Sequence, residues 1–203
     1  MTRPIYLPPY DSPLEDAFAY HAVKYLSEVA CFRPQWDIQT ICGRFVVDFV
    51  IESQGGHRVG FECDGKEFHD KARDEWRDAM ILGSDALDAI YRLRGPDITY
   101  HMNDVLFIVS LCEPLLFSER GHLNLRSLAS DDAQQINVDP VETRINITIF
   151  DEQEKQLNHI FVERRHKVIP SGHRQFCQSA FAFASEYGGG PLDEVIAAYR
   201  NRI

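Results

Sequence analysis

Three carboxylates in two consecutive strand-like segments could bind a cation. Asp48 interrupts the otherwise apolar run RFVVDFVIE, and Glu62 and Asp64 end the next run, HRVGFECD. A hairpin between the two runs would bring Asp48 beside Glu62. Carboxylates gathered in this way repel one another unless a cation or a shared proton offsets their charge. Oxygen ligands suit Mg²⁺, which retains waters and can sit against a substrate phosphate, so we expect metal chemistry here.

The same residues also have purely structural interpretations. An aspartate inside a strand is often a buried acceptor of hydrogen bonds, and an acid at the end of a strand is often only hydrated. The combined spacing Asp-x(13)-Glu-x-Asp-Gly across two adjacent strands, followed by a charged helix, favours the cation site over these alternatives.

The apolar periodicity predicts elements that would position these carboxylates in a mixed sheet flanked by helices. Ser12 and Pro13 are typical of a helix start, and the Gly55-Gly56 pair predicts the turn between the two strands. The first half of the chain is expected to contain helices at about 12–29, 69–82 and 103–112 and strands at about 44–52, 57–64 and 88–94.

The second half has a different pattern. Two strand-like runs, RINITIF and NHIFVERR, are followed by a helix at about 174–187 and a short final helix. We therefore expect a core over residues 1–114 and a smaller α+β extension, a β-hairpin with helices, over residues 115–203.

Composition limits the class of protein. The 203 residues carry a formal net charge of −10, which argues against a non-specific nucleic-acid coat protein, because such proteins are usually strongly basic. The five cysteines form no C-x-x-C motif, and no apolar stretch has the length of a signal peptide or a membrane span. A cytoplasmic protein is the expectation.

The order of the segments resembles the PD-(D/E)XK nuclease superfamily. The runs SPLE, RFVVDFVI, VGFECDG, RDEWRD and IYRLRG follow one another as that superfamily's motifs do. Within it, the chain is most similar to bacterial endonuclease-like domains related to the very-short-patch repair (Vsr) endonucleases. The resemblance covers residues 12–113 and implies an α/β, restriction-endonuclease-like core.

The resemblance also implies roles for individual residues. Asp48 and Glu62 would bind Mg²⁺, or Mn²⁺ in its place, and the backbone carbonyl of Cys63 would supply a third oxygen. Glu15 would approach a water bound to the metal. The basic residues of the following helix, Arg73 and Arg77, would contact phosphate groups of DNA.

Several residues keep a second interpretation. Glu15 also fits the capping box begun by Ser12, and Arg73 and Arg77 could form salt bridges within their own helix. Trp76 suits the core better than a base-stacking surface. The seven-residue spacing of His159, His166 and His173 is interrupted by Pro170 and Gly172, so we expect no metal site on a helix there.

One position departs from the superfamily pattern. Its signature lysine, two residues after the glutamate, is Asp64 in this chain. Asp64 could instead share a metal or orient the attacking water, Lys66 could supply the missing cation, and His69 could act on a water.

These inferences lead to a metal-dependent deoxyribonuclease as the sequence-based hypothesis, a hydrolase that cuts DNA and could form a homodimer. The alternative is a catalytically inactive protein of the nuclease fold that binds nucleic acid or a protein partner.

Overall fold

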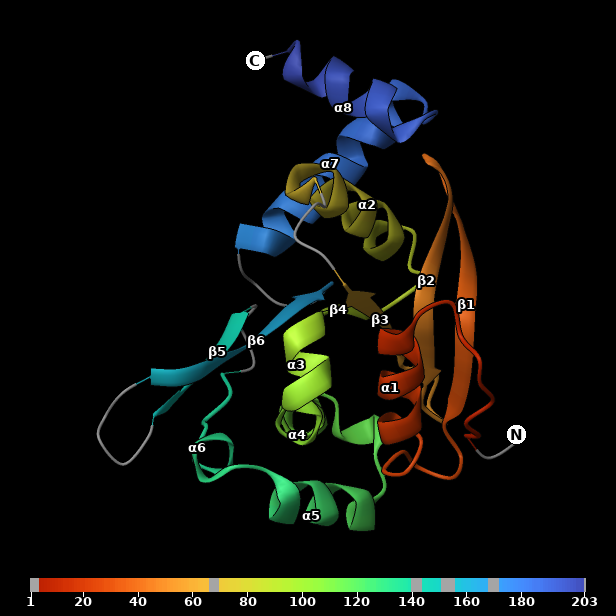
Figure 1. The fold of residues 1–203 in the computed structure, drawn as a ribbon. Coiled ribbons are helices and arrows are strands. Elements are labelled where there is room, and N and C mark those ends of the chain that lie inside the picture. The colour runs from red at the N-terminus through yellow and green to blue at the C-terminus, as the bar shows by residue number, and fades with distance from the viewer. Residues whose placement is uncertain (1–3, 66–69, 140–143, 151–155, 168–171, 203) are drawn as a thin grey trace.

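The computed structural model describes residues 4–65, 70–139, 144–150, 156–167 and 172–202, and it has the expected α/β architecture (Figure 1). Six strands form one mixed sheet in the order β1-β2-β3-β4-β6-β5. Only β3 and β4 run parallel to each other. The strands are β1 (Cys31–Thr40), β2 (Gly43–Glu52), β3 (Arg58–Asp64), β4 (Ala89–Arg94), β5 (Arg144–Phe150) and β6 (Gln156–His166).

Helices cover both faces of this sheet (Figure 1). They are α1 (Pro13–Ala22), α2 (Lys71–Gly83), α3 (Gly95–Tyr100), α4 (Met102–Cys112), α5 (Glu119–Leu128), α6 (Asp131–Gln134), α7 (Gly172–Tyr187) and α8 (Leu192–Arg200), with a 3-10 turn at Pro114–Leu116. The expected mixed sheet flanked by helices is confirmed.

Two apolar cores lie on opposite faces of the sheet. On one face Phe49, Phe61 and Tyr91 pack against α1, α3 and α4. On the other face Val50 and Ile90 pack against α2, α7 and α8. Neighbouring strand residues such as Phe49 and Val50, or Ile90 and Tyr91, therefore enter different cores, as the pleat of a strand requires.

The first part of the chain differs from the expectation at three elements: α1 is shorter, and β1 and α3 were not predicted. The sequence predicted a helix to about residue 29 and an end at Arg33-Pro34, whereas α1 ends at Ala22 and β1 begins at Cys31. A strand containing Pro34 is possible because β1 lies at the edge of the sheet and pairs only with β2, so the missing N–H is not required.

The strands of the second half belong to the same sheet as those of the first. β6 pairs antiparallel with β4, and β5 pairs with β6 as the expected hairpin. α7 packs on α2 through the second core. The boundary at residue 114 stays a prediction, but elements from both sides of it share one sheet and one core.

A buried ion cluster ties these elements together. Asp78 of α2 is fully buried and accepts two hydrogen bonds of 3.0 Å from Arg92 of β4, and Arg165 of β6 donates a third. Burial would raise the pKa of Asp78, but the two guanidinium groups lower it below its ordinary value. The carboxylate is therefore ionised and fully paired at neutral pH.

We expect Asp78→Asn to lower the free energy of unfolding by about 3 to 5 kcal/mol, because Arg92 and Arg165 would lose the fully buried carboxylate that both contact and would keep only the less buried Asp64, Asp74 and Glu163. Urea denaturation measures the loss. The matched control is Asp37→Asn, which breaks an exposed Asp–Arg pair of 2.6 Å and should change stability by less than about 1 kcal/mol. An equally small loss for Asp78→Asn would contradict the importance of the cluster.

Candidate functional site

The structure brings Asp48 and Glu62 onto neighbouring strands, as expected, but protein groups already occupy both carboxylates. One oxygen of Asp48 accepts a hydrogen bond of 2.8 Å from the backbone N–H of Cys63. Glu62 is 6% exposed and lies 2.6 Å from a guanidinium nitrogen of Arg77. The cation beside this carboxylate is therefore Arg77.

Burial controls the ionisation of both groups. It raises the pKa of Asp48 to about 6, against the hydrogen bond from Cys63. It raises the pKa of Glu62 to about 8, and the charge of Arg77 only partly opposes this shift. The repulsion between carboxylates that the sequence predicted is thus relieved by protonation and by an arginine.

The remaining residues expected at this site have other partners. Asp64 lies 3.5 Å from Arg92. The buried carboxylate of Glu15 accepts a hydrogen bond of 2.9 Å from Gln35, while the hydroxyl of Ser12 caps the backbone N–H of residue 15. Lys66 and His69 lie outside the described residues.

The two arginines of α2 do not form salt bridges within their helix. Arg73 pairs with Asp193 of α8 at 2.9 Å, and Arg77 contacts Glu62 and the carbonyl of Val46. Trp76 is buried among the aromatic rings of α7 and α8, as expected. Phosphate contacts by Arg73 and Arg77 stay a prediction.

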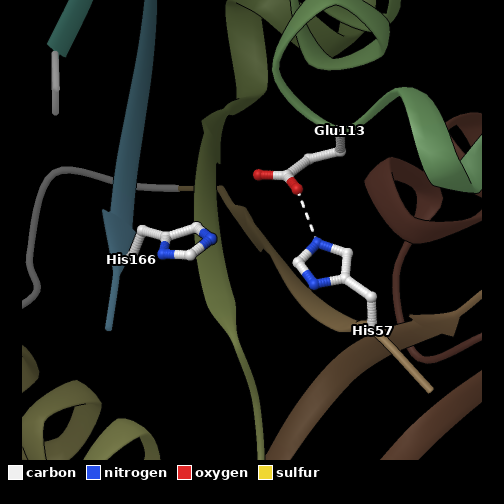
Figure 2. A group of neighbouring side chains, drawn as sticks. All are labelled: His57, Glu113 and His166. Carbon is white, nitrogen blue, oxygen red and sulfur yellow. Dashed lines mark hydrogen bonds and ion pairs between the residues drawn. The ribbon is translucent and has the colours of Figure 1, made fainter. Parts of the chain in front are cut away.

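A different group of side chains has the arrangement of metal ligands. Across the described part of the chain, His57, Glu113 and His166 are the acids, histidines or cysteines that gather three ligand atoms within 4.8 Å of one another. Asp48, Glu62 and Asp64 do not form such a group. Figure 2 shows the two imidazoles and the carboxylate converging beside β4.

The fold brings the three residues together from distant positions in the sequence. His57 immediately precedes β3, Glu113 follows the end of α4, and His166 ends β6. His166 pairs with Ala89, so it lies on the face of β6 that points toward α4. The rings of His57 and His166 are stacked with centroids 6.1 Å apart.

Each of two ligands is oriented by an outer partner. Nε2 of His57 lies 2.7 Å from Oε2 of Glu113, and its Nδ1 lies 3.4 Å from the carboxylate of Asp88. The other oxygen of Glu113 accepts a hydrogen bond of 2.9 Å from the buried hydroxyl of Tyr91. Nε2 of His57 and Oε2 of Glu113 therefore face each other. Asp88 holds the other ring nitrogen of His57, and Tyr91 holds the other oxygen of Glu113.

The charge state of the group follows from these contacts. The hydrogen bond to Glu113 raises the pKa of His57, although burial opposes it. Burial lowers the pKa of His166. His166 is thus a neutral imidazole near neutral pH, the form that binds metals.

No local pattern in the sequence indicates this group. Its members are separated by more than fifty residues, and the sequence-based hypothesis treated His57 as a strand start and Glu113 as a helix end. The spacing of His166 from His159 and His173 did not indicate a metal site. The pairing of β6 with β4, which brings His166 close to the other two residues, cannot be predicted from local sequence patterns.

Comparisons with known proteins do not support a nuclease. Over 162 residues the chain is 29% identical to feruloyl CoA ortho-hydroxylase 1 of Arabidopsis thaliana, a match that covers 77% of this chain and 44% of the relative. The chain thus spans less than half the length of this relative. No family model and no solved structure matches the chain.

The expectation of a DNA-cutting hydrolase, and of its inactive nuclease-fold counterpart, is therefore wrong: the relative found is named for hydroxylation. The expectation of Mg²⁺ or Mn²⁺ at Asp48, Glu62 and the carbonyl of Cys63 is wrong for the same reason. In the structure the guanidinium group of Arg77 already lies beside Glu62 and supplies the positive charge that a metal ion would have supplied. That the relative is an enzyme agrees with the broader expectation of an enzyme.

The other expectations are untouched by these comparisons. Similarity to the PD-(D/E)XK superfamily, DNA as a partner and a homodimer stay predictions. Among the helices described, none combines the length and apolar character needed to cross a membrane.

The raised pKa of Glu62 predicts how stability varies with pH. A carboxyl that binds its proton more tightly in the folded state stabilises the fold fully below its ordinary pKa of 4.5, and this contribution is lost as the pH rises through about 8. A glutamine at this position cannot be deprotonated, so Glu62→Gln removes the stability loss that accompanies ionisation of Glu62. Between pH 5 and 8 the variant should therefore lose less stability than wild type, by on the order of 2 to 4 kcal/mol.

Urea denaturation at the two pH values tests this expectation. Glu119→Gln, a change of the same kind on the exposed start of α5, should keep the wild-type pH dependence. If Glu62→Gln also keeps it, Glu62 is ionised at neutral pH and its charge is fully compensated by Arg77.

Proposed function

We propose that the protein is a metal-dependent oxidoreductase of the hydroxylase class, in which His57, Glu113 and His166 bind one divalent transition-metal ion. The observation that carries this proposal is the convergence of two imidazoles and one carboxylate within 4.8 Å. The hydroxylase named in the sequence comparison supports the reaction class.

The donor set fits an iron-type ion. Two histidines and one carboxylate with open coordination positions are the ligands of non-haem ferrous oxygenases. When bound, such an ion supplies the capacity to change oxidation state and to accept exogenous ligands at its open positions. Ligand atoms that share one ion lie about 3 to 4 Å apart, so small rotations of the three side chains suffice.

The outer partners fit a metal centre as well. Metal-binding histidines commonly place their second ring nitrogen against a carboxylate, which fixes the ring and raises its basicity. Asp88 occupies this position behind His57, and Asp88 is itself held by Lys167 at 2.8 Å and by the backbone N–H of Arg58 at 2.7 Å. Tyr91 holds Glu113 so that a single oxygen remains for the ion.

Glu113 and His57 differ in burial in a way that suits catalysis. The side chain of Glu113 is 3% exposed, whereas that of His57 is 21% exposed. Glu113 is thus anchored inside the protein, and an exogenous ligand can approach from the side of His57. The buried carboxylate also offsets the charge of the ion where water does not reach it.

Metal binding is the first test. We expect the protein to bind one Co²⁺ per chain, detected by visible absorption, and His57→Ala and His166→Ala to weaken binding more than about 100-fold, since each removes a ligand. Asp88→Asn should weaken binding about 10- to 100-fold because it removes only the outer partner. His21→Ala, at a histidine of α1 outside the group, is the control and should bind as wild type does.

Equal affinity of wild type and both histidine variants would reject the metal centre. Circular dichroism of each variant separates loss of a ligand from loss of the fold.

Oxygen uptake tests the reaction class. Protein loaded anaerobically with Fe²⁺ and then mixed with air, ascorbate and feruloyl CoA should consume oxygen and yield a product that carries one additional oxygen atom. His57→Ala treated in the same way should not. Tight binding of metal by wild type without oxygen uptake or product would keep the metal centre and reject the hydroxylase class.

A further inference from the structure

A polar cleft lies at the other end of β3 and β4 from the three proposed ligands. His57 precedes the start of β3, whereas Asp64 at the end of β3 lines this cleft. The cleft has a volume of about 800 Å³, within the range of sites that bind small molecules. Its walls come from α2, from the start of α3 and from the ends of β3, β4, β5 and β6.

The floor of the cleft contains arginines held in fixed positions. Arg92 is 7% exposed and Arg165 is 4% exposed, and both are bound to the buried Asp78. The Nε–H group of Arg165 is buried and has no hydrogen-bond partner in the described part of the chain. A buried donor of this kind is costly unless a ligand or water accepts from it.

Two further cations stand at the rim of the cleft. Lys71 begins α2 and Arg144 begins β5, so they approach the cleft from different walls, and both are exposed. Within the described residues no ion pair of either side chain occurs. By contrast, Asp64 and Asp74 pair with Arg92, and Glu163 pairs with Arg165. Lys71 and Arg144 are therefore available to an anionic ligand.

The cleft also offers a surface for an aromatic ring. The ring of Phe161 lies 5.3 Å from the guanidinium carbon of Arg94, and both residues line the cleft. Arg94 is held by Asp97 through two hydrogen bonds of 2.7 and 3.0 Å. Aromatic side chains and guanidinium planes both stack on the flat face of a heterocycle.

We propose that this cleft binds a small molecule that joins an aromatic heterocycle to phosphate, that is, a nucleoside phosphate. The heterocycle would stack on Phe161 and Arg94, and Lys71 and Arg144 would bind the phosphate oxygens. Binding of phosphate by Lys and Arg is strengthened by the charge of both partners. This site lies beyond the proposed metal centre and does not depend on it.

The acids of the walls favour a short ligand over a nucleic-acid strand. A strand crossing the cleft would carry phosphates past Asp64, Asp74, Glu75 and Glu163, which repel them. A nucleoside phosphate has one end that carries charge, and that end can remain between Lys71 and Arg144. The net charge of −10 adds to the repulsion of a long polyanion.

Isothermal titration of the full chain with ADP tests the proposal. The buffer contains EDTA, so that the result is independent of metal at His57, Glu113 and His166. We expect ADP to bind, and adenosine and inorganic phosphate each to bind at least tenfold more weakly, because each offers half of the contacts. Lys71→Ala and Arg144→Ala should each weaken ADP binding about tenfold or more, as loss of a charge-assisted hydrogen bond does.

Phe161→Leu keeps an apolar side chain but removes the ring, and it should weaken ADP and adenosine while leaving inorganic phosphate unchanged. The matched control is Arg126→Ala on the exposed last turn of α5, which should bind ADP as wild type does. His57→Ala should also bind ADP normally, so failure of the metal centre and failure of this site are distinguishable.

Two results would overturn the proposal. One is the absence of ADP binding, or binding that Lys71→Ala and Arg144→Ala leave unchanged. The other is tight binding of a single-stranded oligonucleotide that displaces ADP and is lost in the same variants, which would make a strand the occupant.

Discussion

The fold depends on a single buried carboxylate. Asp78 neutralises Arg92 of β4 and Arg165 of β6, and it does so from α2, which covers the face of the sheet where these strands meet. Loss of the carboxylate that both buried guanidinium groups contact would be strongly destabilising, so the fold has to bring these three residues together. This requirement joins the second half of the chain to the first and fixes the register of β6 against β4.

That register determines both sites. Because Arg165 faces α2, the next residue, His166, must face α4, where it meets His57 and Glu113. Arg92 and Arg165, held by Asp78, also line the cleft, on the face of the sheet that α2 covers. One ion cluster thus separates a group of metal-ligand type from a cationic cleft and positions each of them.

Local patterns predicted much of the fold and little of the metal centre. The β-branched runs at 44–52 and 57–64 form β2 and β3, and Asp48 and Glu62 are neighbours because hairpin pairing follows from a short turn. β1 was missed because Pro34 is unfavourable inside a sheet and is accepted only at its edge. Arg77 was recognised as basic, but its contact with Glu62 depends on how α2 crosses the sheet, which no spacing within the helix reveals.

The convergence of His57, Glu113 and His166 could not be predicted for a related reason. His57, Glu113 and His166 each end or begin an element, and residues at such positions are usually only hydrated. Their convergence requires the parallel pairing of β3 with β4 and the insertion of β6 beside β4, both of which are long-range. The spacing of the carboxylates of β2 and β3 is the more evident pattern in the sequence, but Arg77 already compensates the charge there.

Anomalous diffraction from crystals of the cobalt-loaded protein would locate the metal ion. We expect one strong peak between His57, Glu113 and His166, with bonds of about 2.0 to 2.2 Å to an imidazole nitrogen of each histidine and to one oxygen of Glu113. A peak between Asp48 and Glu62 in its place, or no peak at the three residues in a fully loaded crystal, would contradict this expectation.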